Sequence, residues 1–532
     1  MIESAVVVRS GRRSQSPKVG LISLGCAKNL VDAEVMLGHL AEQGAEIVRD
    51  IEDAEVVIVN TCGFIDSAKQ ESVETILEVA ARKGKGPLRR LVVAGCMAQR
   101  YARELRAEIP EIDAFIGLDE LETAPAAVLG DLAGDHLPDQ RGALRLYDHT
   151  APRMLATGGV YAYLKVAEGC DNPCTFCHIP AMRGRFRSRS VASLVAEAQR
   201  FEAAGVTEAV LVAQDTTRYG EDLGLGRDGL RRLLEAVLAG TSLPWVRFLY
   251  AYPATLDEKL FSLMRAEPRL VPYLDIPLQH ASRTVLKLMK RGGDLRSYRA
   301  MIERARDEVP GLAVRTTFIV GFPGEGEAEF EELQRFVADV GFDHVGVFTY
   351  SWQPENPGAE LGDPVPPKVK ESRRRLLMKQ QEKISRERHR ALKGTLVTAL
   401  VEGASEESEL LLQGRLPQQA PEVDGRVLFS AGSAAAGDIV EALIRKTYAF
   451  DLVADIERVL RPAPARRSLV LPSLPALPPR TSADNDVTLL RPGGGGVVGW
   501  VGGNGGETSE RPALPALARG ARAGGRRTPR SR

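Results

Sequence analysis

Short apolar runs alternate with helical stretches along most of the chain, and this alternation constrains the fold more than any other feature. Four runs are expected to be buried strands: residues 19–25, 56–63, 90–96 and 112–117. The stretches 29–43 and 66–82 between them have helical spacing. Because strands that alternate with helices build parallel sheets, residues 18–125 are predicted to form a doubly wound parallel-sheet α/β domain.

The alternation resumes after residues 126–155, a Gly- and Pro-containing stretch that we interpret as a linker. Six further strands are expected, at residues 163–169, 208–215, 246–252, 273–278, 313–321 and 343–350. Six parallel strands can curve into an open barrel, so residues 156–387 are predicted to form a central open αβ barrel, like part of a TIM barrel. Active sites of such folds lie at the C-terminal ends of the strands.

The C-terminal part of the chain changes character. Short strands with Gly turns in residues 388–456 indicate a small β-barrel. Residues 457–532 carry 13 Arg, no Lys and five acidic residues, and the Gly- and Pro-rich composition buries no core. We therefore expect this tail, and residues 1–17, to be disordered. No apolar run is long enough to span a membrane and no secretory signal is seen, which predicts a cytoplasmic protein.

Three of the six cysteines lie close together in sequence. Cys170, Cys174 and Cys177 form a C-x₃-C-x₂-C triplet directly after the first strand of the central domain. Three thiolates from one loop can bind three irons of a cubane cluster and leave the fourth iron open for a ligand. The alternative is a zinc site with His178 as the fourth ligand, although structural zinc sites usually show two separated ligand pairs.

The other three cysteines are far apart in sequence but equivalent in position. Cys26, Cys62 and Cys96 each follow a predicted strand of the N-terminal domain. Parallel strands bring their C-terminal ends to one edge of the sheet, so these thiols are expected to converge on one point. They would hold a second, auxiliary cluster with an open iron. The alternative is three buried structural cysteines, since free Cys is among the most buried residue types.

The triplet, with Phe176 before its last cysteine, resembles the radical S-adenosyl-L-methionine (radical SAM) superfamily. Together with the upstream cysteines and the terminal barrel, the chain resembles the methylthiotransferases over about residues 18–456. Motifs that carry the likeness are LGCAKNLVDAE (24–34), EGCDNPCTFCHIPAMRG (168–184) and IVGFPGE (319–325). The resemblance implies an N-terminal methylthiotransferase domain, a radical SAM core and a TRAM domain as the small barrel.

Two branches of this family act on different substrates. One modifies a tRNA adenosine, and the other modifies an aspartate of ribosomal small-subunit protein S-12. VAQDTTRYG (212–220), LYAYPATL (249–256) and YLDIPLQHAS (273–282) look like the second branch. Charge points the same way, because residues 388–456 carry seven Lys and Arg against ten acidic residues. An acidic barrel suits a basic ribosomal protein better than tRNA phosphates.

The resemblance implies two [4Fe-4S] clusters and SAM as cofactors. The cluster on Cys170, Cys174 and Cys177 would bind SAM and split it reductively to a radical that removes hydrogen from the β-carbon of the target aspartate. The cluster on Cys26, Cys62 and Cys96 would present sulfur, and a second SAM would supply the methyl group. Flavodoxin or ferredoxin is the expected electron donor. The cofactor carries the reactivity, and the protein positions it.

Other candidates rest on position alone. Gln214, Asp215, Arg315 and Gly321 lie at or near strand ends and are candidate SAM-binding residues, although Gly321 also suits a plain strand-to-helix turn. Beyond the cluster ligands, no catalytic residue is assigned.

Two basic segments are also open to interpretation. The helix expected at residues 368–393 is a candidate ribosomal RNA contact or a solvated helix surface. The tail is a second RNA candidate, a dispensable extension, or the product of a reading-frame error. Two rival functions remain at this point: the tRNA methylthiotransferase, and a metal-sensing or RNA-binding scaffold with two three-cysteine sites.

Overall fold

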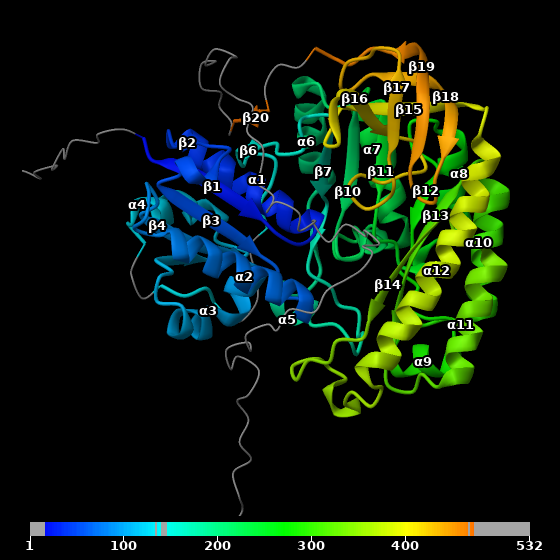
Figure 1. The fold of residues 1–532 in the computed structure, drawn as a ribbon, viewed down its shortest axis with the longest axis horizontal. Coiled ribbons are helices and arrows are strands. Elements are labelled where there is room, and N and C mark those ends of the chain that lie inside the picture. The colour runs from blue at the N-terminus through cyan, green and yellow to red at the C-terminus, as the bar shows by residue number, and fades with distance from the viewer. Residues whose placement is uncertain (1–15, 133–135, 140–145, 466–468, 473–532) are drawn as a thin grey trace, which may run out of the picture.

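The computed structural model shows three folded units that follow one another along the chain (Figure 1). It describes residues 16–132, 136–139, 146–465 and 469–472. Most of the two ends that we expect to be disordered, residues 1–15 and 473–532, lies outside the described residues. Among the helices that are described, none is long and apolar enough to cross a membrane.

The N-terminal unit is a five-stranded parallel sheet in the order β2-β1-β3-β4-β5. Its strands are β1 (Lys18–Ser23), β2 (Glu46–Ile47), β3 (Val56–Thr61), β4 (Arg90–Gly95) and β5 (Ala114–Ile116). Its helices are α1 (Ala27–Glu42), α2 (Asp66–Arg82), α3 (Cys96–Glu108) and α4 (Ala124–Leu129). The doubly wound domain is confirmed. The short β2 was missed, because two residues carry no periodic pattern.

The alternation of side chains along β3 shows why both faces are covered. Val56 and Ile58 pack with α1 and α4 on one face, whereas Val57 and Val59 pack with α2 and α3 on the other. Since successive strand residues point to opposite faces, a strand that is apolar at every position must be buried on both. This arrangement leaves the C-terminal edge of the sheet as the place where functional side chains can gather.

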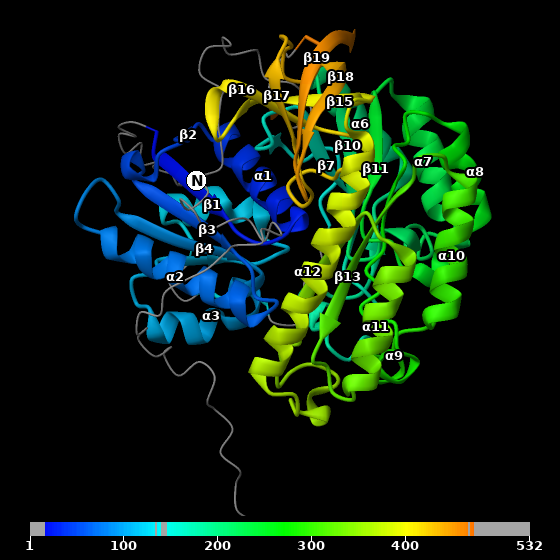
Figure 2. The same ribbon diagram turned by 45° about the vertical axis from the view of Figure 1, so that its right-hand side comes forward.

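The central unit is an open parallel barrel with helices outside it (Figure 2). Its strands are β7 (Tyr161–Lys165), β10 (Glu208–Val212), β11 (Trp245–Phe248), β12 (Tyr273–Asp275), β13 (Ala313–Val320) and β14 (His344–Thr349). Its helices are α6 (Val191–Ala204), α7 (Gly229–Gly240), α8 (Glu258–Ala266), α9 (Arg283–Leu288), α10 (Leu295–Glu308) and α11 (Glu327–Val340). Two three-stranded halves meet at a bridge between Val246 and Leu270. The predicted open barrel is confirmed.

Helix α1 lies between the N-terminal sheet and the central barrel. Its Val35 and Leu37 belong to the core of the N-terminal domain, whereas Val31 packs with the barrel residues Tyr163 and Val212. The same helix therefore serves two cores. Because Cys26 immediately precedes α1, this packing places an auxiliary cysteine against the barrel.

The C-terminal unit is a closed barrel in the order β15-β16-β17-β19-β18, which confirms the expected small barrel. Its strands are β15 (Leu396–Ser405), β16 (Ser408–Arg415), β17 (Val427–Ala431), β18 (Ile439–Thr447) and β19 (Leu452–Arg461). The long helix α12 (Pro367–Leu392) runs along the central barrel to reach it (Figure 2).

Several expected boundaries need correction. Helix α12 continues past residue 388, where we placed the start of the terminal domain. The expected linker 126–155 contains the end of α4 and β6 (Arg153–Met154). The expected disordered tail from 457 contains the end of β19 and a further strand, β20 (Val470–Leu471), which pairs with β6. Leu471 is buried in the central core, and that burial orders a segment whose composition alone favours disorder.

Candidate functional site

The three dispersed cysteines meet at the C-terminal edge of the N-terminal sheet. Cys26 is the residue before α1, Cys62 follows β3, and Cys96 begins α3 after β4. Gly25 has a φ of +90°, and a Cβ atom there would lie 2.9 Å from the Cβ of Cys62. Glycine is therefore required where the Cys26 loop passes the second cysteine. The convergence that strand order predicted is present in the structure.

Charge around these three thiols is uneven. The protein around the Cys26 sulfur opposes its ionisation, but the charges of Lys28 and Arg183, together with the N–H groups of Asn29 and Lys28, outweigh this effect and lower the pKa of the thiol. Burial and the neighbouring thiols raise the pKa of Cys62. Burial also raises the pKa of Cys96, although Arg183 donates to its Sγ at 3.3 Å. Cys26 is exposed and Cys96 is buried, so the set opens on one side.

The triplet occupies the loop after β8 (Ala167–Glu168) and ends before α5 (Ile179–Arg183). The backbone N–H and side-chain amide of Asn172 both lie 3.4 Å from the Sγ of Cys170. The Arg291 guanidinium donates to Cys174 at 3.8 Å. Burial raises the pKa of Cys170 to about 11 and that of Cys177 to about 12. Donors directed at sulfur are what a thiolate that ligates iron requires.

A buried ionic network joins the two cysteine sets. Arg183 is bound by Glu168 of the central barrel at 2.9 Å and by Asp32 of α1 at 3.2 Å, beside its contact with Cys96. Lys165 bridges the same two carboxylates. Each of these buried charges is paired with an opposite charge, and such pairing is what makes the burial of charged side chains tolerable. The network fixes the N-terminal domain, at Asp32 and Cys96, against the central barrel, at Lys165 and Glu168.

A loop after β14 also bridges both sides. Gln353 donates to Asp66 of α2 at 2.7 Å, and Glu355 pairs with Arg100 of α3. On the other side, Asn356 donates to the carbonyl of Phe176 at 3.0 Å within the triplet loop. The loop forms part of the rim around the two sets. The sequence of this loop contains no motif that indicates a function, and its contacts depend on the tertiary fold.

Two of the four positional candidates lie beside the triplet. Asp215 accepts from Asn172 at 2.8 Å, and Gln214 donates to Glu168 at 2.8 Å. Arg315 instead pairs with Asp424 of the terminal barrel and with Asp275. Gly321 has a φ of +75°, and a Cβ atom there would lie 2.3 Å from Lys370 of α12.

Sequence reasoning misjudged part of the basic run after the triplet. Arg183, Arg185, Arg187 and Arg189 follow the triplet at every second position, and a basic run of this kind is more often a solvated surface than a ligand site. Arg185 is 90% exposed, but Arg183 and Arg189 are buried and paired with carboxylates. The four arginines share one spacing but span the end of α5 and the strand β9 (Arg187–Ser188), so no periodic pattern separates the buried ones from the exposed one. Lys28 and Tyr250 were missed entirely.

Within the described residues, no three His, Cys, Asp or Glu side chains converge closely enough to hold one metal ion. A cubane cluster binds each thiolate to a different iron, so its ligands lie farther apart than those of one ion. His178 places Nδ1 3.0 Å from the carbonyl oxygen of Glu355, a contact that ties its ring to the rim loop.

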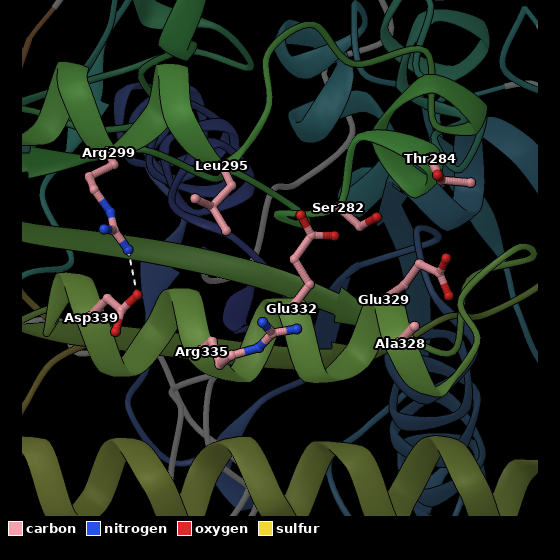
Figure 3. A pocket seen from close by; sticks show the side chains of 9 residues that line it. All are labelled: Ser282, Thr284, Leu295, Arg299, Ala328, Glu329, Glu332, Arg335 and Asp339. Atoms are coloured by element: carbon pink, nitrogen blue, oxygen red, sulfur yellow. Dashed lines mark hydrogen bonds and ion pairs between the residues drawn. The ribbon is translucent and has the colours of Figure 1, made fainter.

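Surface hollows lie elsewhere. A polar hollow of about 450 Å³ between α10 and α11 is lined by the ion pair of Arg299 with Asp339 and by further charged side chains (Figure 3). A larger cavity of about 700 Å³ lies where α12 meets the terminal barrel, with His344 and His389 in its wall. Neither is lined by a cysteine, so neither belongs to the site described above.

Comparison with known proteins identifies the family. Residues 18–117 match uncharacterized protein family UPF0004, residues 164–337 match the radical SAM superfamily, and residues 394–456 match the TRAM domain. The chain is 48% identical to the ribosomal protein uS12 methylthiotransferase RimO of Trichlorobacter lovleyi, over 82% of this chain and 98% of that one. It belongs to the RimO family. The RimO of Solibacter usitatus is 47% identical, over 86% and 98% of the two chains.

Solved structures show more distant likeness to this RimO family member. The radical SAM methyltransferase TsrM from Kitasatospora setae superposes with a TM-score of 0.46 at 16% identity, over 65% of this chain and 77% of that chain. The cobalamin-dependent radical SAM enzyme OxsB gives a TM-score of 0.43 at 14% identity, over 70% and 56%. Family membership therefore rests on the RimO relatives, which cover nearly all of their own length.

Proposed function

We propose that this protein is a ribosomal protein uS12 methylthiotransferase that replaces one hydrogen on the β-carbon of an aspartate with a methylthio group. The observation that carries the proposal is the placement of two three-cysteine sets on either side of one buried ionic network. Removal of hydrogen from an unactivated carbon and insertion of sulfur are separate tasks, and each needs its own centre. The RimO relatives name the substrate protein.

Cys170, Cys174 and Cys177 would hold the [4Fe-4S] cluster that binds SAM, and Cys26, Cys62 and Cys96 would hold the auxiliary [4Fe-4S] cluster. When bound, these groups supply the electron that cleaves SAM and the sulfur that is inserted. The protein itself would position the clusters and SAM and exclude water from them. Arg183 is held by Glu168 within the central domain and contacts Cys96 and Asp32 of the N-terminal domain, so a shift of one domain would break both of the latter contacts.

The positional candidates divide between three tasks. Gln214 and Asp215 are proposed SAM contacts, since both are bonded to residues of the triplet region. Gly321 is proposed to shape the adjacent strand end where α12 crosses it. The charge of Arg315 is already neutralised by Asp424 and Asp275, and we propose that it anchors the terminal barrel to the central one.

Partners beyond the substrate follow from charge. The acidic surplus in residues 388–456 suits a basic ribosomal protein, and the basic α12 offers a contact for ribosomal RNA. A low-potential donor such as flavodoxin or ferredoxin would recharge the site. The observations favour the protein substrate over a tRNA adenosine, since the relatives are named for uS12.

The test is the intact mass of ribosomal protein S-12 from cells with and without this gene. A gain of one methylthio group in place of one hydrogen, localised to an aspartate by fragmentation, is the expected result. An unchanged mass, with loss of a methylthio group from tRNA instead, would overturn the proposal in favour of the other branch.

A second experiment separates the two clusters. The Cys62→Ala variant should still cleave SAM under reduction but insert no sulfur, because the triplet that binds SAM is untouched. Cys174→Ala is the matched variant of the other set and should abolish both activities. Thiolation by Cys62→Ala would show that the auxiliary site has been assigned wrongly.

A further inference from the structure

Lys28 is a buried cation without a carboxylate partner. It lies in the first turn of α1, two residues after Cys26, and is 6% exposed. Among the residues that the structure describes, no carboxylate forms an ion pair with it: its Nζ lies 3.2 Å from the ring centre of Tyr250, and the Cys26 thiol also interacts with its charge. Asp275 feels the Lys28 charge, but it is already paired with Arg315.

The contrast with neighbouring buried cations is direct. Lys165 and Arg183, in the same interdomain space, each bind two carboxylates. A buried charge that lacks a counterion is unfavourable unless a bound group completes it. An aromatic ring offsets only part of that cost, because a cation–π contact is weaker than an ion pair in a dry site. Lys28 is therefore a buried cation at which an incoming anion would meet no paired carboxylate among the described residues.

The residue beneath Lys28 is held in a strained conformation. Tyr250 lies just beyond β11 with a φ of +63°, in the left-handed region that non-glycine residues rarely adopt. Its N–H donates to Asp275 at 3.0 Å, and its carbonyl accepts from Thr216 at 3.0 Å. Strain of this kind persists only where surrounding contacts enforce it, and it gathers at ligand sites. Here it holds the ring against Lys28 at a C-terminal strand end of the barrel.

The position of Lys28 relates Cys26 to the barrel. Cys26 precedes α1, so the positive end of the helix and the Lys28 ammonium point to the same region. Tyr250 belongs to the barrel, and its phenol feels the charge of Cys26. An anion at Lys28 would thus lie between the auxiliary cysteines and the strand ends of the barrel, where a substrate side chain has to enter.

We propose that Lys28 binds the side-chain carboxylate of the target aspartate and so determines specificity for an acidic residue. This inference rests on the proposed function, in which the modified carbon is the neighbour of that carboxylate. Holding the carboxylate at Lys28 places the β-carbon one bond away, within the space that the two cysteine sets share. Lys28 acts by positioning the substrate, and no proton transfer is assigned to it.

The experiment measures binding rather than turnover. Ribosomal protein S-12 with its native target Asp, and the same protein with Asn there, are titrated against the full-length, cluster-loaded enzyme and its Lys28→Met variant. The native enzyme should bind the Asp form about 10- to 100-fold more tightly, the usual worth of a charge-assisted hydrogen bond. Lys28→Met should bind both forms with nearly equal affinity. Lys18→Met, at an exposed lysine, is the matched control and should keep the discrimination.

Each outcome decides the question. Equal binding of the two forms by the native enzyme would overturn the inference without any variant, which covers the case in which Lys28→Met fails to fold. Retained discrimination in Lys28→Met would overturn it too. Weaker SAM binding in that variant, with discrimination unchanged, would assign Lys28 to the SAM carboxylate instead. Failure of either form of S-12 to bind the native enzyme would overturn the proposed function, and this inference with it.

Discussion

Removal of the Arg153 guanidinium should loosen α1 from the rest of the protein. Arg153 is 1% exposed and donates to Glu34 of α1 at 2.9 Å and to Glu197 of α6 at 2.7 Å. It thus joins the N-terminal domain to the barrel. In Arg153→Met, Glu197 keeps Arg189, but Glu34 retains only the N–H of Ala156. Breaking a buried pair by removal of one partner costs about 3–5 kcal/mol.

The protonation of Glu34 gives a similar free-energy cost. Burial raises the pKa of Glu34 above its ordinary value of 4.5 even with Arg153 present. Without Arg153 the folded protein should keep Glu34 protonated at pH 7, and neutralising a carboxyl that far above its ordinary pKa costs about 3.4 kcal/mol. The folded state then binds one more proton than the unfolded state, so stability of the variant rises as pH falls. The loss of stability in Arg153→Met should therefore be about 2 kcal/mol smaller at pH 5.5 than at pH 7.

Hydrogen exchange of α1 measures this opening directly. A loss of 3–5 kcal/mol accelerates exchange through opening by between about a hundredfold and a few thousandfold. The double variant with Glu34→Gln should regain most of the protection. Arg304→Met is the matched control, because the ion pair of Arg304 with Glu258 is exposed and such pairs contribute about 1 kcal/mol or less. A penalty that does not change with pH, or one equal to that of Arg304→Met, would refute the reasoning.

Three further predictions concern packing and titration. Gly38→Ala should cost about 1–3 kcal/mol in urea unfolding, because its Cβ would lie 2.4 Å from the backbone of Pro152; Gly86→Ala, which meets nothing within 4 Å, should show no such loss. A chain that stops after residue 472 should show the same hydrogen exchange at β6 as the full chain. In Leu471→Ala, by contrast, opening at β6 should become easier by about 2–5 kcal/mol. Exchange at β6 that is equal in Leu471→Ala and in the full chain would exclude a role for β20. Burial lowers the pKa of His389, so the folded state binds fewer protons than the unfolded state below about pH 6.5. Stability should therefore fall on acidification in that range, and His389→Gln should flatten the fall in thermal unfolding curves; an equally steep fall in the variant would contradict this prediction.

The sequence by itself determined the order of strands and helices and the meeting of each cysteine set. Cys26, Cys62 and Cys96 could be placed because each follows its strand by one to three residues, and parallel strands end at one edge. The triplet is closer still, since its ligands share one loop. Both inferences need only local pattern and the geometry of a parallel sheet.

Only the tertiary structure decided how the domains join and which charges lie between them. Arg153 and Glu34 are 119 positions apart, and no periodicity links a lysine after Cys26 to a tyrosine after β11. The strands β6 and β20 have two residues each, too few to show alternation, and they are ordered by the cores they enter. Such contacts depend on how whole domains pack. The local sequence records which side chains are apolar or charged, whereas the partner of each charge is chosen by burial in the assembled fold.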